Sequence, residues 1–216
     1  MKFKADGPLF TALTRIFDYL LLNVLWIICS LPLITMGAAT SALYYVMLKI
    51  ERKTDSSITK LYFESFRQNL KKGSILTVTF GACGVLLGFD LLLFKLMGSA
   101  NKEFFHTAIE AALIILLIIW GMALSYSFPL LAQFENSVKQ TIKNALRLAI
   151  ANLKKTVIIL GLNSVFPIVV FVLPEFLFWV LPVYTMIGFS LTAFLNTKLL
   201  VKIFDAYIDP VPKVEN

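Results

Sequence analysis

Residues 21–49 read LLNVLWIICSLPLITMGAATSALYYVMLK and contain no charged side chain before Lys49. Leu31-Pro32 and the small-residue patch at 37–39 interrupt this apolar run near its middle. Because proline lacks an amide donor and disfavours helix in the residue before it, Leu31 is a natural helix end. The pattern predicts two membrane helices joined by a hairpin turn at Pro32, with the turn on the exterior face.

The composition of the whole chain is that of an integral membrane protein. Of its 216 residues, 58% are hydrophobic and 15% are charged, and the mean hydropathy is +0.81. Soluble domains carry about 25% charged residues. The apolar runs are long and continuous, which favours helices over the alternating strands of a membrane β-barrel. We expect a single integral membrane domain over residues 1–216.

Six apolar runs approach the roughly 20 residues that one membrane helix needs. They cover residues 10–30, 33–49, 74–97, 105–129, 156–173 and 178–200. The predicted fold class is therefore all-α, a polytopic transmembrane helical bundle with six spans. An alternative with five spans treats residues 33–49 as a re-entrant or surface helix. With six spans both termini and 18 of the 20 Lys and Arg residues lie in the cytoplasm, and this bias favours six.

Two basic stretches, residues 49–73 and 131–155, show helical amphipathic spacing. Their cations repeat along one side of each predicted helix: Lys60, Arg67 and Lys71 in the first, and Lys139, Lys143 and Arg147 in the second. We predict two cytoplasmic-face amphipathic helices that lie on the membrane and contact anionic head groups. Docking of a protein partner is the second interpretation. No aromatic stacking platform accompanies the charge, so we expect no nucleic-acid partner.

A few polar residues inside the predicted spans are candidates for a site. Asp90, Lys95 and Glu110 could form a small outward-facing pocket for a cation or a proton, because ionisable groups in lipid are costly and usually paired. The favoured interpretation is that they lie near the interface and anchor helix ends. The asparagines Asn23, Asn163 and Asn196 are expected to join helices by hydrogen bonds, with substrate contact as the alternative.

The interruption at Pro32, Thr35 and Gly37 has two interpretations. It could be a broken-helix ligand site of the kind found in transporters, where half-helix ends meet a substrate. A hairpin turn explains the same residues more simply and is favoured. We expect the hydroxyl of Thr35 to cap the helix that follows.

The sequence carries no pattern typical of an enzyme. Cys29 and Cys83 lie within apolar runs, and His106 is the single histidine, so no metal-ligand cluster is expected. The glycine-serine, phosphate-loop and zinc-protease motifs are absent. We therefore expect no enzymatic activity and no cofactor.

The order of residues in the first third of the chain resembles the YesL family. The resemblance rests on Gly7-Pro8-Leu9, Asn23-x-x-Trp26, Ser30-Leu31-Pro32, Thr35-x-Gly37-Ala38-Ala39-Thr40, Ala42-Leu43-Tyr44-Tyr45, Lys49, Phe63, Ser65-Phe66 and Asn69. It implies a bacterial multi-pass membrane protein, from a family defined as a domain of unknown function. It also implies a gene neighbourhood that often holds binding-protein-dependent sugar uptake systems. The family supplies no catalytic residue to carry over.

These features together predict a multi-pass protein of the cell membrane. The expected function is that of a non-enzymatic accessory or assembly component of a bacterial carbohydrate uptake system of the ABC type. Its expected partners are the anionic bilayer and a sugar permease. The alternative is a small solute transporter or channel that acts alone as a homo-oligomer.

Overall fold

The computed structural model describes residues 8–52, 57–96 and 103–208, apart from the side chains of residues 8–12, 95 and 103–106. All regular elements in these ranges are helices, which confirms the predicted all-α class. In chain order they are α1 (Pro8–Ser30), η1 (Leu33–Thr35), α2 (Met36–Glu51), α3 (Ile58–Leu96), α4 (Glu103–Gln133), α5 (Val138–Ala151), α6 (Leu153–Val172), η2 (Pro174–Phe176), α7 (Leu177–Val183), η3 (Tyr184–Gly188) and α8 (Phe189–Ile208). Six helical segments are long and apolar enough to cross a membrane, as predicted.

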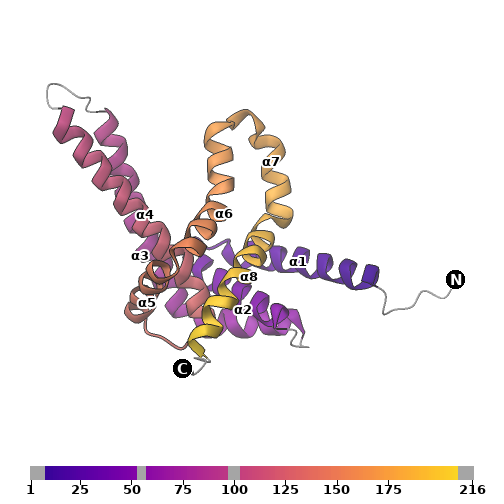
Figure 1. Ribbon diagram of the computed structural model, residues 1–216. Coiled ribbons are helices and arrows are strands. Elements are labelled where there is room, and N and C mark those ends of the chain that lie inside the picture. Colours follow the sequence, from indigo (N-terminus) through magenta and orange to yellow (C-terminus); the bar gives the residue numbers. More distant parts are fainter. Residues whose placement is uncertain (1–7, 53–56, 97–102, 209–216) are drawn as a thin grey trace, which may run out of the picture.

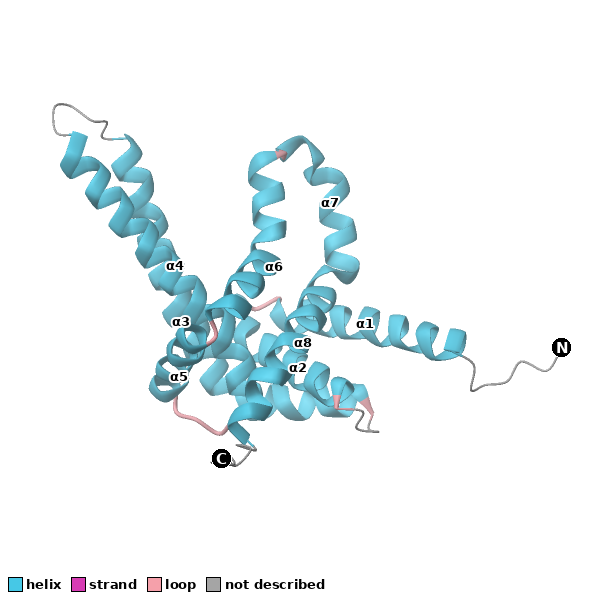
Figure 2. Ribbon diagram, in the orientation of Figure 1, coloured by secondary structure: helices cyan, strands magenta, loops and turns pink. Residues whose placement is uncertain are grey.

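Two helical hairpins project from a common base (Figure 1). One is formed by α3 and α4 and the other by α6 and α7, and their tips point in the same general direction. The base contains α2, α5 and the lower part of α8, while α1 extends from it to the side. Figure 2 shows that the described connections between these helices are short.

Helix α2 is the buried centre of the base. Among the candidate spans its segment is the most enclosed, with 56% of the residues buried against 28% or less in the others. The sequence explains this, because Gly37, Ala38, Ala39, Ser41 and Ala42 are small enough to let neighbouring backbones approach closely. Helices α1, α3, α4 and α8 surround α2.

The first basic stretch does not form a separate surface helix, which corrects the prediction for residues 49–73. Residues 58–73 and the third predicted span form one continuous helix, α3, of 39 residues. No proline lies between Ile58 and Leu96, and one glycine inside a helix costs only about 1 kcal/mol, so Gly73 does not break it. The second basic stretch does form its own helix, α5. Ser137 caps that helix by accepting a hydrogen bond from the Gln140 amide at 3.3 Å.

The Pro32 turn lies at the base and not at the level of the hairpin tips, so it does not share their membrane face as the six-span prediction requires. The amide of Gly37 donates to Thr77 Oγ1 at 2.8 Å, and Tyr62 Oη donates to the Ala39 carbonyl at 3.4 Å. Tyr62 belongs to the basic half of α3. From Thr77 to Leu96 the helix rises about 28 Å, which is close to the ~30 Å of a bilayer's hydrocarbon core. The turn and the α3–α4 tip therefore lie about one membrane thickness apart.

The sixth predicted span is continuous but contains a widened turn. Helix α7 passes into the π-helical segment η3 and then into α8, two residues after Pro182. The side chain of Asn23 from α1 is inserted there. Its Nδ2 donates to the Thr185 carbonyl, and its Oδ1 accepts from the Ser190 amide at 3.0 Å. The asparagine thus takes the place of a backbone hydrogen bond and fixes α1 to this turn.

Candidate functional site

A cavity of about 630 Å³ lies between the two hairpins, above α2. Helices α2, α3, α4 and α6 supply its lining. The apolar part of this lining consists of Met36, Phe80, Gly81, Trp120, Gly121, Leu124, Phe128, Leu160 and Pro167. Its polar part consists of Thr40, Tyr44, Thr77, Ser125, Asn163 and Ser164. The volume falls within the range of about 300–1,000 Å³ that ligand pockets occupy.

A chain of neutral hydrogen bonds runs behind the cavity and joins four helices. Asn163 on α6 donates to Ser125 Oγ on α4 at 3.0 Å. Asn196 on α8 donates to Asn163 Oδ1 at 2.8 Å and to Tyr44 Oη on α2 at 3.0 Å. Asn163 and Asn196 therefore join helices as predicted. Because every member is uncharged, the chain can exist at membrane depth without the cost of a buried charge.

A smaller cavity of about 140 Å³ adjoins the first and shares Thr40, Tyr44 and Asn163 with it. Its walls are aromatic. Trp26 stacks on Phe189 with ring centroids 3.8 Å apart, and its indole N–H donates to Thr40 Oγ1 at 3.0 Å. The family-like residues of α1 and α2 thus line the space between the hairpins.

The predicted ionisable candidates lie elsewhere. Asp90 is exposed on α3, and Glu110 is half-buried on α4. Lys95 belongs to α3, but its side chain lies outside the described part of the structure. Neither Asp90 nor Glu110 lines either cavity. Their interpretation as helix-end anchors at the interface remains a prediction.

The predicted helix-break motif is a packed turn in this structure. Thr35 does not cap α2; its hydroxyl instead donates towards the carbonyls of Cys29 at 2.6 Å and Pro32 at 2.8 Å. A side chain on Gly37 would clash with Thr77, with Gly73 and with Phe128. The glycine is therefore needed for close approach of α2 to α3, and no motif residue lines either cavity.

All six predicted contact cations are exposed. Lys60, Arg67 and Lys71 lie on the basic half of α3, and Lys139, Lys143 and Arg147 lie on α5. The ion pairs found among the described residues involve none of them. Both rows belong to the base of the molecule, at the ends of the helices away from the hairpin tips.

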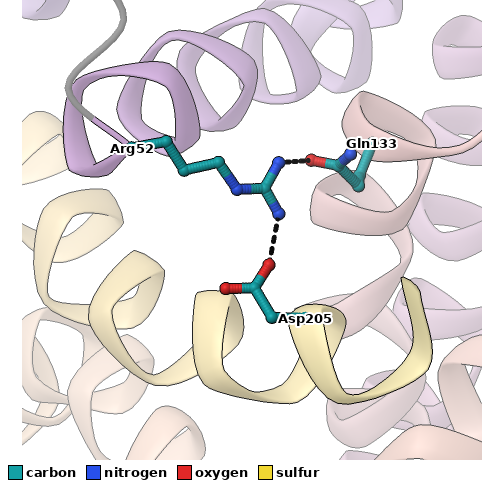
Figure 3. Close-up of polar contacts among 3 residues, drawn as sticks. All are labelled: Arg52, Gln133 and Asp205. Carbon is teal, nitrogen blue, oxygen red and sulfur yellow. Dashed lines mark hydrogen bonds and ion pairs between the residues drawn. The ribbon is translucent and has the colours of Figure 1, made fainter. Parts of the chain in front are cut away.

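An ion pair that the sequence did not suggest closes the base (Figure 3). Arg52 at the end of α2 donates to Asp205 Oδ1 on α8 at 2.7 Å and to Gln133 Oε1 on α4 at 3.0 Å. Both partners are partly exposed, so the pair contributes only about 0–1 kcal/mol to stability. Its role is to hold three helix ends in register. Arg52 and Asp205 are too far apart in sequence for any local spacing to indicate the pairing.

These features define a class: a polytopic α-helical membrane protein with a neutral interhelical site and a cationic base. Comparison with known proteins then shows what the chain is similar to. Residues 19–91 match the family model described as "Protein of unknown function, DUF624". This match covers the N-terminal stretch that carried the resemblance to the YesL family, and it confirms that resemblance.

One relative is the "Uncharacterized protein YteU" of Bacillus subtilis (strain 168). It is 26% identical over 145 residues, which is 65% of this chain and 63% of the relative. The match therefore spans less than two thirds of that protein. No solved structure matches this chain.

Proposed function

We propose that this protein is a non-enzymatic membrane component that binds another membrane protein through its cationic base. The observation that carries the proposal is the pair of exposed cation rows on α3 and α5, which form no ion pair among the described residues. A rigid helical face with unpaired cations suits an acidic segment of a partner as well as anionic head groups. The partner is proposed to be a sugar permease in a bacterial carbohydrate uptake system of the ABC type. That choice comes from the family resemblance and not from the geometry.

The proposal includes a location and an orientation. In this proposal the protein lies in the cell membrane with its base and both termini in the cytoplasm, which is supported by the cations on the basic half of α3 and on α5 at the base. Because the Pro32 turn also lies at the base, α1 and α2 would then stay on the cytoplasmic side and not cross the bilayer. Lysine and arginine accumulate on the cytoplasmic side of membrane proteins. The hairpin tips would then face the exterior. Enzymatic activity is not part of the proposal, since the sequence supplies no nucleophile motif.

A second candidate function is a small solute transporter or channel that acts alone, as a homo-oligomer. The specific observation in its favour is the cavity with its neutral hydrogen-bond chain. Asn163 lies near the middle of α6, about 12 Å along the helix from Lys155 and about 14 Å from Val172. Substrate sites of secondary transporters also lie near the midplane of the bilayer.

Mild-detergent purification followed by mass spectrometry separates the two functions. We expect the wild-type protein to retain a sugar permease during purification. The triple charge reversal Lys60→Glu, Arg67→Glu and Lys71→Glu should reduce recovery of the permease about tenfold or more, because the cations no longer attract and pair with acidic groups of the partner. The same reversal of Lys139, Lys143 and Arg147 on α5 should also lower recovery, because both cation rows belong to the proposed interface. Asp90→Asn should leave recovery unchanged.

The transporter candidate predicts a different set of results. The purified protein alone would move a solute into liposomes, and Asn163→Leu, which alters the cavity lining and its hydrogen-bond chain, would abolish that flux. Absence of any enriched permease, or equal recovery with the α3 charge reversal, would contradict the accessory function.

A further inference from the structure

The larger cavity is lined by uncharged residues only. No Asp, Glu, Lys, Arg or His stands among the residues that form it. Asn163, one of the polar lining residues, lies about 12 Å along α6 from Lys155. Half the hydrocarbon core of a bilayer is about 15 Å thick, so a membrane surface at Lys155 would put the polar lining inside the hydrocarbon. A charged ligand would have no counter-charge at this depth and would be costly to hold there. The ligand that fits is therefore uncharged.

The polar lining has unused hydrogen-bond donors. Thr40 and Thr77 donate to helix carbonyls. The Nδ2 groups of Asn163 and Asn196 donate within the chain, whereas Asn196 Oδ1 is buried without a partner among the described residues. The hydroxyls of Tyr44 and Ser125 each accept a hydrogen bond from an asparagine. Their own O–H protons have no acceptor among the described residues. A hydroxyl supplies one donor and can accept as well, so both are free to donate into the cavity.

The rest of the cavity suits hydrocarbon. Phe80, Trp120 and Leu160 form broad apolar walls, and Gly81 and Gly121 leave room beside them. Trp120 is fixed in place, because its indole N–H donates to the Phe80 carbonyl at 3.0 Å. The site therefore combines an apolar slot with the hydroxyl donors of Tyr44 and Ser125, and the lining residue Ser164 carries a further hydroxyl.

We propose that this cavity binds an uncharged amphiphile from the bilayer, of the diacylglycerol type. The acyl chains would lie along Phe80, Trp120 and Leu160, and an ester or hydroxyl oxygen would accept from Tyr44 and Ser125. Phospholipids are excluded because their phosphate would lie among groups that offer no cation. This inference stands apart from the proposed docking function, since it uses none of the basic residues.

The test compares two photoactivatable lipids in nanodiscs of phosphatidylglycerol and phosphatidylethanolamine. One probe is a diacylglycerol with a diazirine in its acyl chain, and the other is a phosphatidylcholine with the same chains. After illumination and proteolysis, mass spectrometry locates the label. We expect the diacylglycerol to label cavity-lining segments of α3, α4 and α6 about tenfold more than the phosphatidylcholine does, because the phosphate of the latter would find no counter-charge in the cavity.

A matched pair of double variants controls for folding. Tyr44→Phe with Ser125→Ala removes the two hydroxyls proposed to bind the ligand and should lower diacylglycerol labelling to the phosphatidylcholine level. Tyr126→Phe with Ser127→Ala makes the same chemical changes at two buried residues that do not line the cavity. Labelling should persist in that control. Equal labelling by both probes, labelling that survives loss of Tyr44 and Ser125 hydroxyls, or no label in the cavity would each overturn the proposal.

Discussion

Gly73→Val is expected to remove almost all folded protein. A Cβ at this position would lie 2.6 Å from the backbone nitrogen and 2.7 Å from the Cα of Ala38 on α2. These are backbone atoms, so no side-chain rotation can relieve the contact. Overpacking typically costs about 1–3 kcal/mol and sometimes more. We expect a loss of stability at the upper end of this range or above it, because α2 is the centre of the base. Fluorescence-detected size-exclusion chromatography should then show loss of the monodisperse peak.

The control for this variant lies in the same helix. A Cβ at Gly88 would meet nothing within 4 Å, so Gly88→Val should give a wild-type profile. The two variants change the same residue type in the same way on α3. A monodisperse Gly73→Val protein with unchanged thermal stability would show that α2 does not pack on α3 as described.

Asn23→Leu is expected to lower stability by about 2–4 kcal/mol. The Asn23 side chain lies where a backbone hydrogen bond is missing at η3. It donates to the Thr185 carbonyl and accepts from the Ser190 amide. Its removal leaves two buried backbone groups without partners, and each such group costs about 1–3 kcal/mol. The measurement is the midpoint of thermal unfolding in detergent, which should fall clearly below that of the wild type.

Asn69→Leu provides the comparison for Asn23. Asn69 Nδ2 donates to the Ser65 carbonyl one turn earlier in the same helix. That carbonyl keeps its helical partner when the side chain is lost, so we expect a change below about 1 kcal/mol. If the two leucine variants unfold at the same temperature, the asparagine at η3 does not replace a backbone hydrogen bond.

The sequence predicted the elements well because their signals are local. Apolar runs of sufficient length indicated each membrane helix, and the spacing of the cations in residues 131–155 indicated α5. Asn163 and Asn196 were expected to join helices, and they do so. In each case, the physical cause lies within a few residues of the side chain concerned or follows from its polarity in an apolar segment.

The arrangement of the helices could not be predicted in the same way. Whether α3 continues through Gly73 depends on packing against α2, since a lone glycine permits either outcome. The position of the Pro32 turn depends on contacts with Tyr62 and Thr77, which are distant in sequence. The cavity likewise needs residues from four helices, and the Arg52–Asp205 pair joins residues 153 positions apart. Positive-inside counting cannot detect such contacts, because it treats each segment separately.

The central claim is that α2 and the Pro32 turn lie at the base, opposite the hairpin tips. Single-cysteine labelling tests it most directly, in a Cys29→Ala, Cys83→Ala background. Leu33→Cys reports on the turn and Glu175→Cys on the α6–α7 tip, and both positions are exposed. We expect a membrane-impermeant maleimide to label Glu175→Cys in intact cells and to reach Leu33→Cys only in inverted vesicles. Labelling of both cysteines from the same side of the membrane would contradict the claim.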